Sequence, residues 1–442
     1  MSRKKRKRRS NPEEICRSVS LTHDLEPVAR ELHKKACCGS IELWPELANC
    51  GGIANAPSDL RHNFLLKSNQ GMREAQQHII NIVTRTVDAS PSEVILYRSI
   101  ADSIAWQFLG NQLCYARVLY KGQRPPSLKH SNFESVLMAC NKIHEDHPDS
   151  VPLISDLTSF IQVGDILASI PGMPLKIVEV KEGKHNHTLL EIMTKAGREE
   201  ISEADVIEFL KGSSHKTIDQ LQRMNRQIGR ASHVTELMAT GQSIDPDTSY
   251  AHRIPEKEVP MRSWSEDVNS LIEESHHKGW AIDIVDDCLF LGVYSNPKMI
   301  QAAHIAFNVW FDSCGATMQC PRGTLIDSMR IPLALPPFNQ DLPHESMFDA
   351  LFGRLHVCIG VNIKALVMAC IRNAIEVRSG TKRETSHAQQ KRLAPLIFEN
   401  RSVFMKMQDR EVQITQGIFL RMMFHSQRPI SVIKAMLANF PD

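Results

Sequence analysis

The chain has 442 residues, of which 42% are hydrophobic and 23% are charged, and its formal net charge is +2. This length exceeds what one core usually supports, so two or three domains are expected. The composition is globular, which permits an enzyme without requiring one, and the small net charge points to no particular partner. The 11 cysteines are odd in number and form no Cys-x-x-Cys pair, which suits neither a zinc site nor a disulfide framework and favours a reduced, intracellular protein.

Positive charge is concentrated at the start of the chain, where residues 3–9 are all Lys or Arg. Such a block predicts a disordered arm, which could bind phosphate backbones, act as a nuclear address or be a solvated tail without a partner. No apolar segment follows it, so it does not indicate a signal peptide, and residues 1–60 are expected to be irregular. The longest apolar stretch, 357–371, is too short and too polar to cross a bilayer. The expected location is the cytoplasm, or the nucleus if the source is eukaryotic.

Helical patterns come next in the chain. Apolar spacing predicts a helix from about residue 70. Ser90-Pro91-Ser92-Glu93 is a capping box that predicts a helix reaching Tyr120, which Gly110 could divide into two. A second capping box, from Ser131 to Glu134, predicts a helix over 131–146.

The pattern then changes to strands. Residues 152–184 are rich in Val, Ile and Leu and predict a hairpin, with strands over 160–169 and 175–181 and a turn centred on Gly172. The sequence further predicts a strand over 188–193, a helix over 202–209 and a long helix over 215–240.

A second region follows residues 241–262, which carry three prolines and no periodicity and therefore predict a linker. Beyond it, an αβ region is expected, with a strand pair over 281–294 that turns near Asp286-Asp287. Paired aspartates in a turn usually accept backbone hydrogen bonds, and a metal site is the less common alternative. Helices are predicted over 264–277, 297–312, 345–355, 363–378 and 416–424.

Three side chains in the predicted hairpin could carry chemistry. If the strands pair symmetrically about Gly172, Asp165 faces Glu179, with Cβ atoms roughly 5 Å apart. The two-residue period of a strand puts Lys181 on the same face as Glu179. Two adjacent carboxylates repel each other unless a cation lies between them, and Mg²⁺ prefers one or two carboxylates together with phosphate oxygens and water.

The spacing of Asp165, thirteen residues and then Glu179-x-Lys181 resembles the PD-(D/E)XK nuclease superfamily over about residues 125–240. This resemblance implies a restriction-endonuclease-like core, which is a mixed sheet flanked by helices. It further implies that Asp165 and Glu179 bind Mg²⁺ or Mn²⁺ and that Lys181 activates or positions the attacking water.

The resemblance also suggests residues on the flanking helices. Glu134 is the candidate for an additional metal ligand, although its role in the capping box is a competing explanation. RecB-like members of the superfamily carry a Gln-x-x-x-Tyr signature, for which Gln220 is the candidate, while Met224 stands in place of the Tyr.

Several basic residues could contact a nucleic acid backbone. They include Lys184, just after the Glu-x-Lys strand, and four residues of the long helix: Lys216, Arg223, Arg226 and Arg230. A solvated helix face is the alternative explanation of the four.

The resulting fold class is α/β, with a nuclease-like core followed by a second α+β domain. The expected domains are a basic arm and irregular segment (1–60), a helical lead-in with the nuclease-like core (61–240), the linker (241–262) and an αβ domain of unassigned role (263–442). The sequence thus predicts a metal-dependent nuclease that acts on nucleic acid, with DNA favoured, in a setting such as repair or defence. The alternative is a non-catalytic nucleic-acid-binding or assembly protein. In either case no membrane partner is expected, and residues 263–442 could bind substrate, a protein partner or a second copy.

Overall fold

The computed structural model divides the chain into two compact units. Unit 2 is Glu31–Ile254, and unit 1 comprises Met1–Arg30 and Pro255–Asp442. The boundary near residue 255 lies inside the expected linker. The structure describes residues 20–85, 89–130, 133–181, 188–189, 191–193, 209, 213–246, 249, 251–254, 261–391, 393–407 and 410–439. The basic block at 3–9 and the helix expected over 202–209, apart from Phe209, lie outside these residues.

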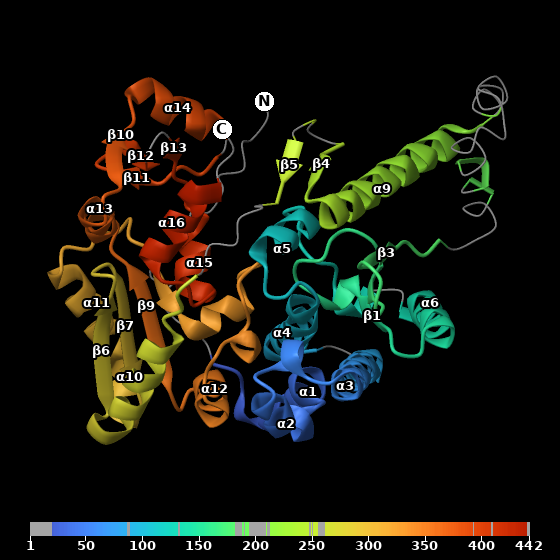
Figure 1. The fold of residues 1–442 in the computed structure, drawn as a ribbon, viewed down its shortest axis with the longest axis horizontal. Helices are drawn as coiled ribbons and strands as arrows, with labels where there is room; N and C mark the ends of the chain where they lie inside the picture. Colours follow the sequence, from blue (N-terminus) through green and yellow to red (C-terminus); the bar gives the residue numbers. More distant parts are fainter. Residues whose placement is uncertain are drawn as a thin grey trace, which may run out of the picture. The chain divides into compact units, whose positions relative to one another are not determined.

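The chain begins with helices. They are α1 (Glu26–Cys38), α2 (Trp44–Asn49), α3 (Ser58–Arg85), α4 (Pro91–Phe108), α5 (Leu113–Leu119) and α6 (Phe133–Asp146), with short 3₁₀ turns at His23–Leu25, Ile41–Leu43, Ile53–Asn55 and Leu128–His130 (Figure 1). Residues 20–60 are therefore largely helical, not irregular. The capping box from Ser90 to Glu93 is confirmed, and the helix ends before Gly110, where φ of 55° is incompatible with a continuing α-helix.

Helix α4 passes through the core of unit 2. All residues from Leu96 to Trp106 are buried, so this helix is surrounded on every side. Trp106 packs against Phe160, with ring centroids 5.1 Å apart. Polar side chains of α4 form hydrogen bonds with the backbone of the buried loop that contains Phe160. Arg98 donates to the carbonyl oxygens of Asp156 and Thr158, and Asp102 accepts from the amide of Ser159.

The predicted hairpin belongs to a three-stranded antiparallel sheet of order β1-β2-β3. Its strands are β1 (Val151–Ile154), β2 (Ile166–Ser169) and β3 (Lys176–Val178), and a 3₁₀ turn at Ser155–Leu157 follows β1. Ile166 pairs with Val178 and Ala168 with Lys176, so the predicted register, symmetric about Gly172, is confirmed.

Two expectations about this sheet are wrong. All its pairings are antiparallel, so among the described residues it is not a mixed sheet. The strand expected over 160–169 begins only at Ile166, because Gly164 adopts φ of 79° and interrupts the extended chain. Phe160, Ile161 and Val163 are buried all the same. They fill the core from a loop whose backbone groups bond to side chains of α4, as described above.

The second half of unit 2 is dominated by α9 (His215–Thr240), a long helix with the predicted bounds (Figure 1). It ends at Gly241, whose φ of 77° is typical of a helix C-cap. Part of the expected linker then pairs as the antiparallel strands β4 (Gln242–Ile244) and β5 (Ala251–Arg253). The described residues within 188–193 are helical, so the strand expected there is wrong.

Unit 1 contains an antiparallel sheet of order β6-β7-β9-β8. Its strands are β6 (Trp280–Val285), β7 (Leu289–Tyr294), β8 (Arg322–Thr324) and β9 (His356–Val361). The predicted turn between β6 and β7 is confirmed, with φ of 50° at Asp286 and 61° at Asp287. Helix α10 (Ser265–Lys278) packs on β6 and β7, and α11 (Pro297–Ser313) packs on β7 and β9.

The rest of unit 1 forms a second sheet and further helices. Strand β12 (Arg401–Met407) pairs with β10 (Glu376–Ser379), β11 (Ile397–Phe398) and β13 (Arg410–Gln413). The helices are α12 (His344–Leu351), α13 (Ile363–Arg372), α14 (Lys382–Gln390), α15 (Ile418–Phe424) and α16 (Pro429–Asn439), with 3₁₀ turns at Leu325–Met329 and Pro337–Asn339. The helix expected over 363–378 therefore ends at Arg372, and its remainder enters β10.

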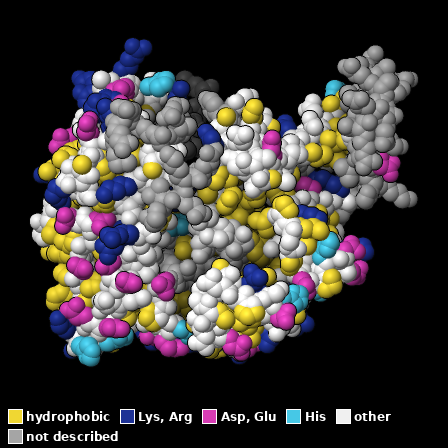
Figure 2. Space-filling view, in the orientation of Figure 1, with side chains coloured by type: hydrophobic (Ala, Val, Ile, Leu, Met, Phe, Trp, Pro, Cys, Tyr) yellow, Lys and Arg dark blue, Asp and Glu magenta, His cyan; other side chains and the backbone are white. Residues whose placement is uncertain are grey.

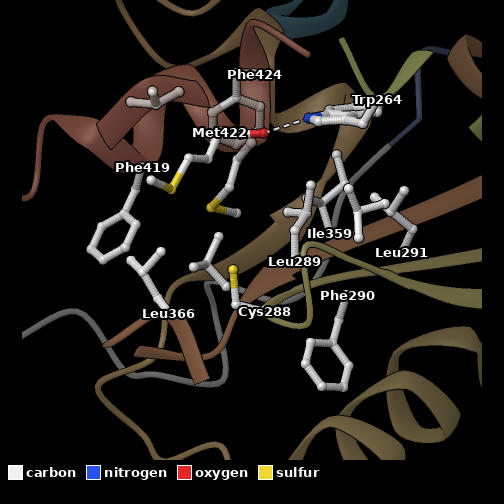
Figure 3. Close-up of a cluster of buried hydrophobic side chains, with 14 of the residues drawn as sticks. Trp264, Cys288, Leu289, Phe290, Leu291, Ile359, Leu366, Phe419, Met422 and Phe424 are labelled. Carbon is white, nitrogen blue, oxygen red and sulfur yellow. Dashed lines mark hydrogen bonds between the residues drawn. The ribbon is translucent and has the colours of Figure 1, made fainter. Parts of the chain in front are cut away.

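The core of unit 1 joins its sheet to its last helices (Figure 3). Trp264 is fully buried, and its indole Nε1 donates to the carbonyl oxygen of Met422, 2.7 Å away. Leu289, Leu291 and Ile359 fill the neighbouring space from β7 and β9. No helix among the described residues is both long and apolar enough to cross a membrane.

Candidate metal and phosphate site

Backbone contacts hold Asp165 at the start of β2. Its amide donates to the carbonyl oxygen of Val178 at 2.8 Å, and its own carbonyl oxygen accepts from the amide of Ser155 at 2.9 Å. The side-chain Oδ2 accepts from the amide of Val180 at 2.6 Å. The carboxyl of Asp165 is therefore fixed against the backbone between Glu179 and Lys181.

Glu179 and Lys181 follow β3 and form an ion pair. Lys181 Nζ lies 3.1 Å from Glu179 Oε2, and it also donates to Gln227 Oε1 on α9 at 2.8 Å. The side chains of Lys181 and Glu179 are only 14% and 18% exposed. Two of the three predicted residues thus touch directly, and their partner on α9 fixes the ammonium group.

The carboxyl of Asp165 lies in an environment that disfavours its charge. Burial is the main reason that its pKa is raised, and the carboxylates of Glu179 and Asp156 raise it further. The amide of Val180 and the ammonium group of Lys181 act in the opposite direction. Asp165, Glu179 and Lys181 therefore interact electrostatically, and a cation beside Asp165 would relieve the cost of its charge.

The residue of α9 that contacts Lys181 is Gln227, which is not among the residues predicted from the sequence. Gln220, selected instead, is partly buried two turns earlier on the same helix. Gln220, Met224 and Gln227 are spaced by four and three residues and so share one face of α9. Met224, which stands where the superfamily signature has Tyr, is completely buried. The spacing of the two glutamines was the signal that could have identified Gln227.

Glu134 lies near the start of α6 with an exposed side chain. Among the described residues, neither Glu134 nor any other Asp, Glu, His or Cys forms a group of three potential ligands with Asp165 and Glu179. Ser131, its expected partner in a capping box, lies outside those residues. Asp156 is the further carboxylate that acts on Asp165, and it comes from the 3₁₀ turn after β1.

Three of the four basic residues predicted on α9 are exposed to solvent. Lys216, Arg223 and Arg226 are exposed, while Arg230 is partly buried. Lys184 lies outside the described residues. On the face that Figure 2 shows, Lys and Arg side chains are interspersed with acidic ones. The three exposed side chains can reach a phosphate backbone as well as solvent.

Two other groups of side chains could hold a metal ion. One joins His233, Asp245 and His252 in unit 2, and the other joins His304, His356 and Cys358 in unit 1. Burial and the neighbouring His304 lower the pKa of His356 to about 4, so that its imidazole is neutral at pH 7. Sequence spacing did not reveal either group, because each is completed by residues distant in sequence: α9, the end of β4 and β5 supply the first, and α11 and β9 the second.

Unit 1 also contains a pocket of 990 Å³. Its lining includes Lys382 and Thr385 of α14 and Arg401 of β12. None of the predicted site residues lines this pocket, so its size says nothing about the chemistry at Asp165.

Comparison of the chain with protein-family models, with curated proteins and with solved structures finds no match. The assignment of a function therefore depends on the residues of the site alone.

Proposed function

We propose that this protein is a metal-dependent nuclease of the PD-(D/E)XK type, which hydrolyses phosphodiester bonds in nucleic acid, with DNA favoured. The observation that carries the proposal is the register about Gly172, which brings the Asp165 carboxyl beside Glu179 and Lys181. Helix α6 precedes the β1-β2-β3 meander and α9 follows it, and these flanking helices support the proposal, whereas the antiparallel meander differs from the mixed sheet that the resemblance implies.

Asp165 and Glu179 would hold the Mg²⁺ or Mn²⁺ ion. The fit of a cation is supported by the raised pKa of Asp165, because burial and a neighbouring carboxylate are costs that a bound cation offsets. Oδ2 of Asp165 accepts one backbone hydrogen bond, and the carboxylate keeps further lone pairs with which it could bind the ion. When bound, the ion would supply positive charge to the phosphate and to the attacking water.

Lys181 would position the water and stabilise the charge that develops on the phosphate. Its ammonium group has three donors, and two of them are directed at Glu179 Oε2 and Gln227 Oε1. The third donor can therefore face a water or a phosphate oxygen. Fixing the ammonium group in advance matters, because a donor already in place needs no reorganisation during the reaction.

A second function is favoured by the same hydrogen bonds. Lys181, Glu179 and Gln227 satisfy one another and join β3 to α9, as a purely structural polar cluster would. In that case the domain would be a non-catalytic nucleic-acid-binding or assembly module. The two functions differ in one respect: only the nuclease requires Asp165 for the binding of a divalent ion and for cleavage.

The test is incubation of the full chain with linear, circular and single-stranded DNA and with RNA, in Mg²⁺ and in Mn²⁺. We expect Asp165→Asn and Lys181→Ala each to reduce cleavage on the order of 100-fold or more, and a chelator to abolish it. Lys176→Ala is the matched control, because Lys176 is an exposed lysine of β3. If cleavage survives both substitutions, or if the wild type cleaves no substrate, the nuclease proposal is rejected. The non-catalytic module is then the function that stands.

A further inference from the structure

A group of potential metal ligands lies where α9 ends and the β4–β5 hairpin begins (Figure 1). His233 comes from the last turns of α9, Asp245 follows β4 and His252 is the middle residue of β5. His233 and Asp245 are buried, and His252 is partly buried. One nitrogen or oxygen atom of each side chain lies within 4.8 Å of the other two.

The two imidazoles are spaced as ligands of one ion would be. His233 Nε2 and His252 Nδ1 are 3.3 Å apart. Two nitrogens that each lie about 2.0–2.1 Å from a tetrahedrally coordinated ion are separated by about 3.3–3.4 Å. The separation therefore suits two nitrogens that share one ion, and in the absence of an ion the two rings form a long hydrogen bond.

Hydrogen bonds behind His233 orient its ring for this role. Ser243 donates its single hydroxyl proton to Glu236 Oε2 at 2.5 Å. Because that proton is used, the Ser243 oxygen, 3.0 Å from His233 Nδ1, must accept from the imidazole. The neutral ring then carries its proton on Nδ1 and directs the Nε2 lone pair toward His252. Metal-binding histidines are commonly oriented by such outer partners.

We propose that His233 Nε2, His252 Nδ1 and a carboxylate oxygen of Asp245 form a binding site for a divalent transition-metal ion of the Zn²⁺ class. Imidazole ligands favour Zn²⁺ and its neighbours in the first transition series, whereas Mg²⁺ prefers oxygen ligands alone. The site is therefore chemically distinct from the one assigned to Asp165 and Glu179. Bound there, the ion fastens the β4–β5 hairpin to the end of α9.

The probe is Co²⁺ alone, added to the full chain, because its visible absorption reports the type of ligand, and Zn²⁺ is then used to displace it. With excess Mg²⁺ present to occupy the site assigned to Asp165 and Glu179, we expect one Co²⁺ per chain with nitrogen and oxygen ligands. His252→Gln and Asp245→Asn should weaken binding at least 10-fold, and Ser243→Ala, which removes the partner of His233 Nδ1, should weaken it by about 10- to 100-fold. Circular dichroism checks that each variant remains folded.

Two controls separate this site from the others. His62→Gln changes an exposed histidine of α3, and Asp165→Asn disables the proposed nuclease site; neither should alter Co²⁺ binding. Failure of one proposal thus leaves the other intact. The inference is overturned if the wild type binds no Co²⁺, or if folded His252→Gln and Asp245→Asn proteins bind it unchanged. It is also overturned if a thiolate band appears and Cys358→Ser abolishes it, because the ion then lies with His304, His356 and Cys358.

Discussion

The carboxyl of Asp102 shows at the scale of one residue how burial changes a titration. Asp102 lies in the fully buried part of α4, and Oδ1 accepts from the amide of Ser159 at 2.7 Å. Burial raises its pKa from 3.8 to about 6, against the opposing effects of Ser159 and Arg98. The folded state therefore holds the proton more tightly than the unfolded chain does. The contribution of protonated Asp102 to the free energy of unfolding is fully present below pH 3.8 and is lost as the pH rises through 6.

Replacing Asp102 with Asn should remove this pH dependence, because the amide does not titrate. The free energy of unfolding of the wild type, minus that of Asp102→Asn, should fall by about 1–2 kcal/mol between about pH 5 and pH 8. Urea denaturation at several pH values measures this difference. Parallel curves for the two proteins would contradict the raised pKa.

Gly164, next to Asp165, allows a comparison of two glycine substitutions. Its φ is 79°, and a Cβ atom built on it would lie 2.4 Å from Cγ2 of Ile177. Gly172 has a similar φ of 77°, but nothing lies within 4 Å of its Cβ position. We expect Gly172→Ala to cost about 1 kcal/mol through backbone strain alone. Gly164→Ala should cost about 1–3 kcal/mol more, because the added methyl group also collides with the side chain of Ile177. Equal losses in thermal or urea denaturation would argue against this close contact.

At the scale of secondary structure, the contact between β3 and α9 completes the proposed site. Gln227→Ala should lower cleavage on the order of 10-fold, because Lys181 loses the partner that fixes its ammonium group. Gln222→Ala is the control, since Gln222 is an exposed glutamine of the same helix. Initial rates of cleavage for the two variants measure the effect. Equal rates would remove Gln227 from the site.

Local signals in the sequence predicted several elements well. The capping box at Ser90, the turn about Gly172 and the bounds of α9 each follow from neighbouring residues, and each agrees with the structure. The predicted extent of β2 does not agree with the structure, because the apolar residues at 160–163 suit a strand as well as a buried loop. The positive φ of Gly164 ends the extended chain, and the buried loop before it is held by Arg98, which donates to Thr158, and by Asp102, which accepts from Ser159. Those contacts with α4 are distant in sequence.

The candidate site could be predicted only in part for the same reason. The residues Asp165, Glu179 and Lys181 meet across one turn, so spacing was enough to place them together. Gln227 and Asp156 join them from α9 and from the 3₁₀ turn after β1. Their identity depends on how the helix and the turn pack, which short-range patterns do not encode.

At the scale of the whole molecule, the two units have separate cores. Trp264 belongs to unit 1, and Trp264→Phe keeps most of its volume but removes the donor to the Met422 carbonyl oxygen. We expect a loss of about 1–3 kcal/mol in the free energy of unfolding. Cleavage at a temperature where the variant stays folded should be unchanged, because the proposed site lies in Glu31–Ile254. Urea denaturation and cleavage rates test both parts, and a large loss of activity in the folded variant would show that unit 1 contributes to the reaction.

The most direct measurement is the initial rate at which the wild type and Asp165→Asn cut a fluorescent linear DNA duplex in Mn²⁺. If the aspartate holds the catalytic ion, the wild type cleaves and the folded variant loses on the order of 100-fold or more of that rate. Equal rates for the two proteins would contradict a catalytic role for the hairpin.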